Sequence, residues 1–234
     1  MDVHLVDPAA YAELAEQFAL RRTLPDTVDE VIDQARKHLA ADAACVTLLH
    51  AGRQWKTVGA SDETVAQADA WQQELGEGPC LEAAWDQHLL TVNDLANDAR
   101  WPRWGPRAME LGIGSILAVE MYTDRGRLGA LNLYWSSPRT FDDDEVAFAH
   151  LFARHSAVAL AAARTHDHLV VAMDARTLTG QAQGVLMVCY GIEADRAFAV
   201  LQRLSQDNNV KLRVIAEEVV RRRSLPDESV LSRV

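Results

Sequence analysis

Two glycines near the C-terminal end of the chain lie among cationic and amide side chains. Arg176, Gly180 and Gln183 are spaced at i, i+4 and i+7, so they share one face of a helix, and Gly184 follows directly. Proteins meet folded RNA with cations and amides, and a glycine lets a phosphodiester backbone come close. These residue types are compatible with RNA binding. The ordinary alternatives are a solvated charge at Arg176 and close helix packing at Gly184.

A second group of such residues, Asn209, Lys211 and Arg213, surrounds the expected start of a later helix. The unpaired N–H groups and the dipole at a helix N-terminus favour phosphate. Asn209 could equally serve as the helix N-cap, and the two cations could be ordinary exposed positions. This group is likewise compatible with binding to a phosphate.

The other side chains that could do chemistry lie between residues 62 and 104, and they are Trp71, Cys80, Trp85, Trp101 and Trp104. Aromatic side chains line many ligand pockets, and they also dominate ordinary core packing. The sequence indicates a candidate ligand pocket here and leaves core packing as the alternative.

The three cysteines, Cys45, Cys80 and Cys189, match no metal-ligand spacing. We expect buried thiols that act as small apolar side chains. Neither a metal site nor a cofactor is expected.

The net charge of −11 is unevenly distributed along the chain. Residues 166–234 hold nine Lys/Arg and nine Asp/Glu, so the whole acidic excess lies in residues 1–165. This split predicts two parts with separate roles, and charge alone does not argue for RNA. The composition is that of a soluble protein, with no secretory signal and no apolar run expected to cross a bilayer. We therefore expect a cytoplasmic protein without membrane contact.

A long helix is expected to position the first group of residues. From Phe141 to Thr179 there is neither Gly nor Pro, acidic residues crowd positions 142–145, and Gly191 provides a stop signal. We predict one helix over 141–190, with a break near Thr165 as the alternative. An apolar stripe favours a homodimer in which two such helices pair in parallel as a coiled coil, through Phe148, Leu151, Phe152, Val158 and Ala162.

Hydrophobic periodicity outlines the rest of the chain. Helical patterns occur at 9–20, 25–39 and 62–75, and strand patterns at 44–51, 53–61, 114–124 and 126–137, the last two forming a hairpin. The segment GEGPC (76–80) is interpreted as a turn-rich loop. Helices flanking an antiparallel sheet make an α+β domain over 1–165. Helices at 194–206 and 210–222 join the end of the long helix in an all-α three-helix bundle over 166–223, and 224–234 is predicted to be a disordered tail.

Several segments of the first part resemble the GAF domains that precede ANTAR modules in actinobacterial regulators. They are ELGEGPCLEA (74–83), VNDLANDARWPRW (92–104), LGALNLYW (128–135) and the closing Phe141-Asp142. The resemblance implies a sensor domain with a pocket on one face of the sheet, roofed by the 62–104 region. The signature of cyclic-nucleotide GAF domains is absent, so the small-molecule or protein signal is left open.

The second part resembles the ANTAR family in ARTLTGQAQGVLMVCYGIEADRAF (175–198) and RLSQDNNVKLRVIAEEVVRR (203–222). ANTAR modules bind paired RNA stem-loops and prevent a transcription terminator from forming, and the resemblance implies the same here. It also implies that the two groups described above form the RNA-binding surface, namely Arg176, Gly180, Gln183, Gly184, Asn209, Lys211 and Arg213. Many ANTAR sequences have Lys where this chain has Gln183, and an aliphatic residue in place of Thr179. Losing one cation should weaken RNA binding and flatten its salt dependence.

Together these patterns predict a non-enzymatic, signal-controlled RNA-binding regulator of transcription antitermination. One alternative is a redox enzyme like the GAF-type methionine-sulfoxide reductases, with Cys80 attacking and Cys45 resolving. The other is a regulator that acts through protein partners or DNA.

Overall fold

The computed structural model describes residues 8–50, 54–85 and 89–225. The chain divides into two compact units, Met1–His166 and Asp167–Val234. One helix, α6 (Asp143–Tyr190), begins in the first unit and ends in the second. The long helix predicted from the sequence is therefore confirmed, and it has no break near Thr165.

The first unit contains a five-stranded antiparallel sheet with the strand order β2-β1-β5-β4-β3. The strands are β1 (Ala43–His50), β2 (Gln54–Ala60), β3 (Leu89–Val92), β4 (Ser115–Thr123) and β5 (Gly126–Trp135). The predicted hairpin is confirmed, because Thr123 pairs with Gly126 across a two-residue turn. Gly126 has φ +118°, a conformation that favours glycine.

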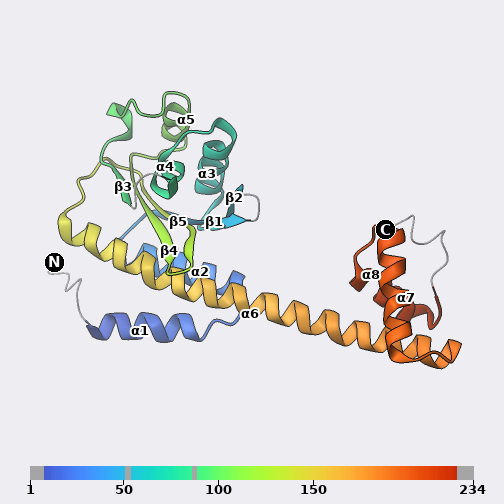
Figure 1. The fold of residues 1–234 in the computed structure, drawn as a ribbon. Coiled ribbons are helices and arrows are strands. Elements are labelled where there is room, and N and C mark those ends of the chain that lie inside the picture. Colours follow the sequence, from blue (N-terminus) through green and yellow to red (C-terminus); the bar gives the residue numbers. More distant parts are fainter. Residues whose placement is uncertain (1–7, 51–53, 86–88, 226–234) are drawn as a thin grey trace. The chain divides into compact units, whose positions relative to one another are not determined.

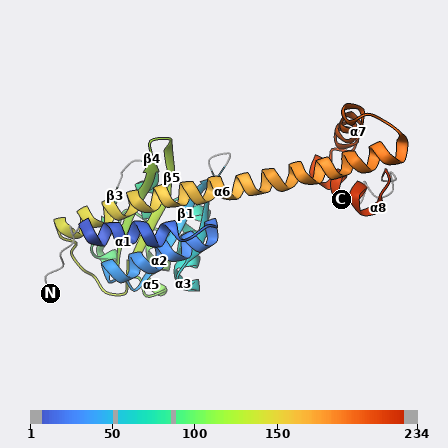
Figure 2. The same ribbon diagram turned by 90° about the horizontal axis from the view of Figure 1, so that it is seen from below.

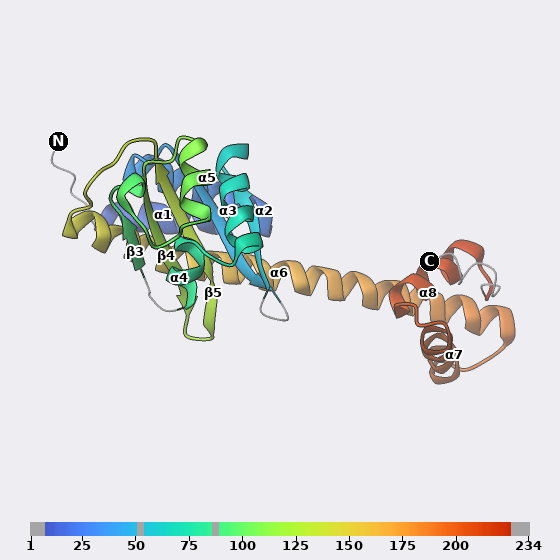
Figure 3. The ribbon, with the colours of Figure 1, turned by 90° about the horizontal axis from the view of Figure 1, so that it is seen from above.

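Helices cover both faces of this sheet, which confirms the α+β class (Figures 1 and 3). One face packs against α1 (Pro8–Ala19), α2 (Leu24–Leu39) and the first part of α6, through a core that includes Val46, Leu131, Leu133 and Phe152. The other face is covered by a set of elements that we name the lid: α3 (Glu63–Leu75), α4 (Pro79–Trp85), the short helix η1 (Leu95–Asn97) and α5 (Trp104–Glu110). Alternating residues of β1 and β5 thus serve two separate cores.

Local hydrogen bonds fix the starts of the main helices. Thr23 Oγ1 accepts a hydrogen bond from the N–H of Asp26 at the start of α2, and Asp62 accepts one from Val65 at the start of α3. At α6 the cap is reciprocal. Asp142 Oδ1 accepts from the N–H of Glu145 at 2.8 Å, and Glu145 Oε2 accepts from the N–H of Asp142 at 3.3 Å.

The apolar stripe predicted on α6 is divided between buried and exposed positions. Phe148 and Phe152 lie in the core of the first unit, whereas Leu151 and Val158 are exposed, at 39% and 62%. By length and composition alone α6 could cross a membrane, contrary to the expectation from the sequence. However, 44% of its most apolar window is buried inside the protein.

The second unit consists of the end of α6 with α7 (Ala194–Asp207) and α8 (Leu212–Arg222). Its small core is formed by seven buried residues from all three helices, namely Ala182, Leu186, Ala197, Leu201, Ile215, Ala216 and Val219. The stop signal after α6 is confirmed, since Gly191 has φ +61° and its N–H donates to the carbonyl of Met187. Figure 2 shows α7 and α8 on either side of the end of α6. Of the predicted tail, residues 226–234 lie outside the described residues.

Candidate functional site

The glycine-bearing face of α6 in the second unit is open. Arg176, Gly180 and Gly184 are all exposed. A Cβ atom built on either glycine would meet nothing within 4 Å, so close packing of α6 inside this unit does not explain them. A flat backbone strip beside a cation is therefore available to an incoming group.

Gln183 has a contact of its own within the unit. Its Nε2 donates a hydrogen bond of 3.2 Å to the carbonyl of Ala194 at the start of α7. The amide thus links the end of α6 to the first turn of the next helix. This hydrogen bond gives Gln183 a structural role. A lysine at this position could donate to the same carbonyl and would add a positive charge.

The start of α8 differs from the sequence expectation in one respect. Lys211, not Asn209, occupies the N-cap position, and its side chain makes no capping hydrogen bond. Asn209 is exposed and adopts the left-handed conformation (φ +52°) that closes the turn after α7. Asn208 instead donates from Nδ2 to the carbonyl of Leu204. The alternative that Asn209 caps the helix is wrong, because Lys211 occupies the N-cap and Asn209 lies three positions before Leu212, the first residue of α8.

The consequence is an uncapped helix N-terminus between two cations. Lys211 and Arg213 are both exposed at this end of α8. The N–H groups of Val214 and Ile215 donate to the carbonyl of Lys211, and no side chain caps the helix, so the N–H groups of Leu212 and Arg213 are the ones that face an incoming acceptor. Such an end favours a phosphate.

In the first unit, the GEGPC segment connects α3 and α4 and contacts the start of α5. Glu77 accepts hydrogen bonds at 2.6 and 2.7 Å from the N–H groups of Arg103 and Trp104, and it thereby caps α5 from 26 residues away. Gly78 has φ +143°, and a Cβ there would lie 2.4 Å from Cγ of Gln72. The Glu77 hydrogen bonds join the segments 74–83 and 92–104, and the close approach of Gly78 holds the loop against α3.

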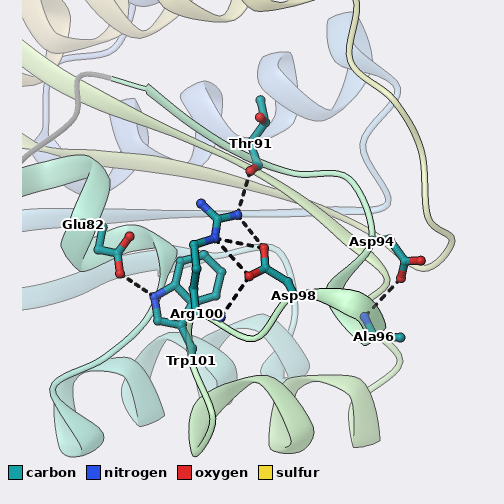
Figure 4. A network of polar contacts seen from close by, with 7 residues as sticks. All are labelled: Glu82, Thr91, Asp94, Ala96, Asp98, Arg100 and Trp101. Atoms are coloured by element: carbon teal, nitrogen blue, oxygen red, sulfur yellow. Dashed lines mark hydrogen bonds and ion pairs between the residues drawn. The ribbon is translucent and has the colours of Figure 1, made fainter.

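A further polar network holds the middle of the lid (Figure 4). Trp101 donates from Nε1 to Glu82 at 2.7 Å, which ties the 92–104 segment to α4. Arg100 lies over the Trp101 ring, pairs with Asp98 and donates to the carbonyl of Thr91. The lid is therefore closed by hydrogen bonds as well as by apolar contacts.

The tryptophans singled out in the sequence are part of this packing. Trp101 and Trp104 are fully buried, and the Nε1 of Trp104 donates to the carbonyl of Ala68 at 2.8 Å. Trp71 is half-buried and lies near Arg107. The side chain of Trp85 lies outside the described residues. The indoles of Trp101 and Trp104 thus help to hold the lid together.

Sequence reasoning missed a buried polar centre between the lid and the sheet. Asp69 of α3 is 1% exposed. Its carboxylate accepts hydrogen bonds from the side chains of Thr47, Thr57, Gln72, Gln73 and Asn132. The Oδ1 atom of Asn132 accepts none from any described residue. The one available signal was a polar residue at an inward position of an otherwise apolar strand, LGALNLYW.

Two thiols adjoin this centre. Asn132 donates from Nδ2 to Sγ of Cys45 at 3.5 Å, and the backbone N–H of Cys80 donates to Gln72 at 2.8 Å. Burial, reinforced by the charge of Asp69, raises the pKa of both thiols. Both are therefore held as neutral thiols. Cys189 is exposed, so the prediction of three buried cysteines was wrong for this residue, whose Sγ donates to the carbonyl of Arg223 at 3.3 Å.

No group of three or more His, Cys, Asp or Glu side chains that could hold a metal ion occurs within residues 8–50, 54–85 and 89–225. These features define a modular protein with a lid-covered α+β domain followed by a small all-α domain.

Comparison with known proteins identifies both modules. The family described as "GAF domain" matches residues 21–161, and the family described as "ANTAR domain" matches residues 167–220. The GAF match spans more than half of the chain, so this protein belongs to the GAF family, with an ANTAR domain following. No match was found among curated proteins.

Solved structures resemble the first unit at the level of the fold. The GAF domain of a phosphoenolpyruvate-protein phosphotransferase from Coxiella burnetii is 17% identical, with a TM-score of 0.54, over 67% of this chain and 94% of that one. The corresponding Acinetobacter domain is 13% identical, with a TM-score of 0.52, over 70% and 97%. The GAF region of a putative membrane protein from Geobacter sulfurreducens is 19% identical, with a TM-score of 0.51, over 58% and 92%.

Proposed function

We propose that this protein is a signal-responsive transcription antiterminator of the actinobacterial GAF–ANTAR type, which binds paired RNA stem-loops through its ANTAR domain. The observation that carries the proposal is the ANTAR match over residues 167–220, because that range contains every residue of the proposed RNA-binding surface. A cytoplasmic location goes with this role.

The RNA-binding surface combines the open strip at Arg176, Gly180 and Gly184 with the start of α8. On the strip, two glycines without neighbours allow a sugar–phosphate backbone to approach α6, and Arg176 supplies a cation. At α8, Lys211 and Arg213 flank an uncapped helix end. The amide of Gln183 donates to the carbonyl of Ala194 at the start of α7, and the amide of Asn209 is exposed shortly before α8. Phosphate contacts of this kind supply affinity, and single-stranded loops supply specificity.

The protein acts as a homodimer through α6 in this proposal. Four large apolar side chains within residues 169–173 of α6, Leu169, Val170, Val171 and Met173, are between 42% and 68% exposed. Exposed apolar side chains in such a run are a common mark of a protein interface. Two linked ANTAR domains would bind two stem-loops of one transcript, and the second binding event would profit from a raised effective concentration.

The GAF domain receives the signal beneath its lid. The candidate pocket comprises the lid residues Trp71, Cys80, Trp85, Trp101 and Trp104 together with the buried centre at Asp69 and Asn132. An unpaired acceptor on Asn132 next to a buried carboxylate supports this location, because a ligand N–H group could satisfy it.

An electrophoretic shift assay at several salt concentrations tests the proposal. The full chain is offered a tandem-hairpin RNA, a scrambled RNA of equal length and a DNA duplex, and its mass in solution is measured alongside. Preference for the tandem hairpin, with loss of affinity in Arg176→Gln and Lys211→Gln, is the expected result. Equal binding of all three polyanions would contradict the RNA proposal, and preference for the duplex would favour a DNA-binding regulator.

The redox alternative finds little support in the GAF domain. A nucleophilic thiol requires a lowered pKa and access to its substrate, whereas burial raises the pKa of Cys80. Methionine-sulfoxide turnover that disappears in Cys80→Ala would nevertheless establish it.

A further inference from the structure

A groove of about 720 Å³ runs between α1 and α6 in the first unit, on the side of the sheet away from the lid. Its volume is within the range of sites for drug-sized molecules. Phe18, Ala159 and Ala163 form the deeper part, and Val158 and Ala162 are exposed at the rim. The groove is therefore an uncovered apolar surface. Its residues belong neither to the proposed RNA-binding surface nor to the candidate ligand site beneath the lid.

The charge of the groove is opposite to that of the unit that contains it. The polar residues lining it are Arg21, Arg22, His155 and His166, and no acidic residue is among them. Residues 1–165 nevertheless carry the whole net charge of −11. Arg21 pairs with Glu30, whereas Arg22 forms no ion pair with any residue in the described ranges. The groove thus offers a cation to an anionic occupant.

Arg21 and Arg22 lie at one end of the groove, just after α1. α1 and α6 run side by side in the same direction (Figures 1 and 2). Arg22 follows the last turn of α1, and His166 is the last lining position on α6. The lining positions from His155 to His166 extend over roughly 17 Å of helix at 1.5 Å per residue. The result is an elongated apolar channel with a cationic end.

We propose that this groove binds a free long-chain carboxylate, a fatty acid, with its alkyl chain between α1 and α6 and its carboxylate at Arg22. A second copy of the chain fits less well. In a two-fold contact the same patch supplies both sides, and this patch offers Arg21 and Arg22 but no acidic residue to pair with them. A contact between two such patches lacks charge complementarity, whereas a single carboxylate complements the cationic end.

The inference stands without RNA binding, because every lining residue belongs to the first unit. It has a consequence for the proposed dimer. Val158 is exposed on α6 and also lines the groove, so an α6–α6 contact at this level and an occupied groove exclude each other. The dimer contact would then be restricted to the apolar run from Leu169 to Met173.

Titration calorimetry with sodium dodecanoate below its micelle concentration tests the proposal on the full chain. We expect saturable binding with one site per chain, and binding at least tenfold weaker in Val158→Asp and Arg22→Glu. Two matched variants, Leu151→Asp on the same helix and Arg125→Glu on the β4–β5 turn, lie outside the groove and should bind normally. If Val158→Asp does not fold, Ala162→Trp fills the groove instead and should show the same loss.

Four outcomes would overturn the proposal. Dodecyltrimethylammonium could bind as tightly as dodecanoate, which would remove the role of the cations. The control variants could lose as much affinity as the groove variants. Binding could be confined to anionic phospholipid vesicles, which would indicate a membrane surface. Lastly, Val158→Asp could convert a dimer into a monomer while dodecanoate has no effect, which would assign the groove to a second copy.

Discussion

Replacing Gly180 and Gly184 by alanine should stabilise the ANTAR domain and weaken its RNA binding at the same time. Neither glycine has a positive φ, and an added Cβ meets nothing within 4 Å. Alanine in a helix interior is favoured over glycine by about 0.5–1 kcal/mol. The two positions together should therefore contribute about 1–2 kcal/mol. For a domain of this size, each kcal/mol raises Tm by about 4–8 °C.

RNA binding should change in the opposite direction. If the phosphodiester backbone approaches α6 at these glycines, two methyl groups would stand between helix and phosphate. We expect about a tenfold loss of affinity for the tandem hairpin, equivalent to about 1.4 kcal/mol. A substitution that only relaxed the fold would not separate the two effects in this way.

Thermal unfolding and hairpin binding are measured on the same preparations of the double variant, with Gln202→Ala as control. Gln202 is exposed on α7, so alanine there leaves the glycine strip unchanged. Unchanged RNA affinity in the double variant would refute the role of the glycines. A lower Tm would refute the conclusion that the space around them is empty.

Three further results are expected. Arg176→Gln should weaken binding to all RNA sequences alike and reduce the slope of log K against log salt by about 1, measured by titration at several salt concentrations. Although desolvation opposes it, hydrogen bonds from the N–H groups of Arg103 and Trp104 hold the pKa of Glu77 below its usual range. The GAF domain should therefore lose stability as the pH falls through this lowered pKa, and Glu77→Gln should flatten that loss in urea titrations. A thiol reagent should modify only Cys189 in the folded protein and reach Cys45 and Cys80 after unfolding; three fast-reacting thiols would contradict the described burial.

Local signals made much of the fold predictable from the sequence. The acidic first turn and the glycine after Tyr190 define the ends of α6, and the Asp124-Arg125-Gly126 turn defines the central hairpin. These signals depend on neighbours within a few residues, so they can be read without the tertiary structure. The short helices α4 and α5 were missed because their stability depends on Glu77 and Glu82, which reach across the lid.

The sites were less predictable for the same physical reason. From the sequence, Asp69 resembles a solvated charge on a helix. Only the folded structure shows that Thr47 and Asn132, from strands far away in sequence, donate hydrogen bonds to it. Cys189 lies in an apolar segment of the sequence, and only the folded structure shows that it is exposed. The residues of the proposed RNA-binding surface came from the ANTAR resemblance, and their exposure is compatible with that role without testing it.

Strand β5 passes between two cores, and this has a mechanical consequence. Asn132 faces the buried polar centre beneath the lid, while its neighbours Leu131 and Leu133 pack in the core that contains Phe148 and Phe152 of α6. Consecutive residues share a rigid peptide plane. A ligand that shifts the backbone at Asn132 would therefore also shift the leucines on either side of it, and these leucines share a core with Phe148 and Phe152 of α6 on the opposite face of the sheet.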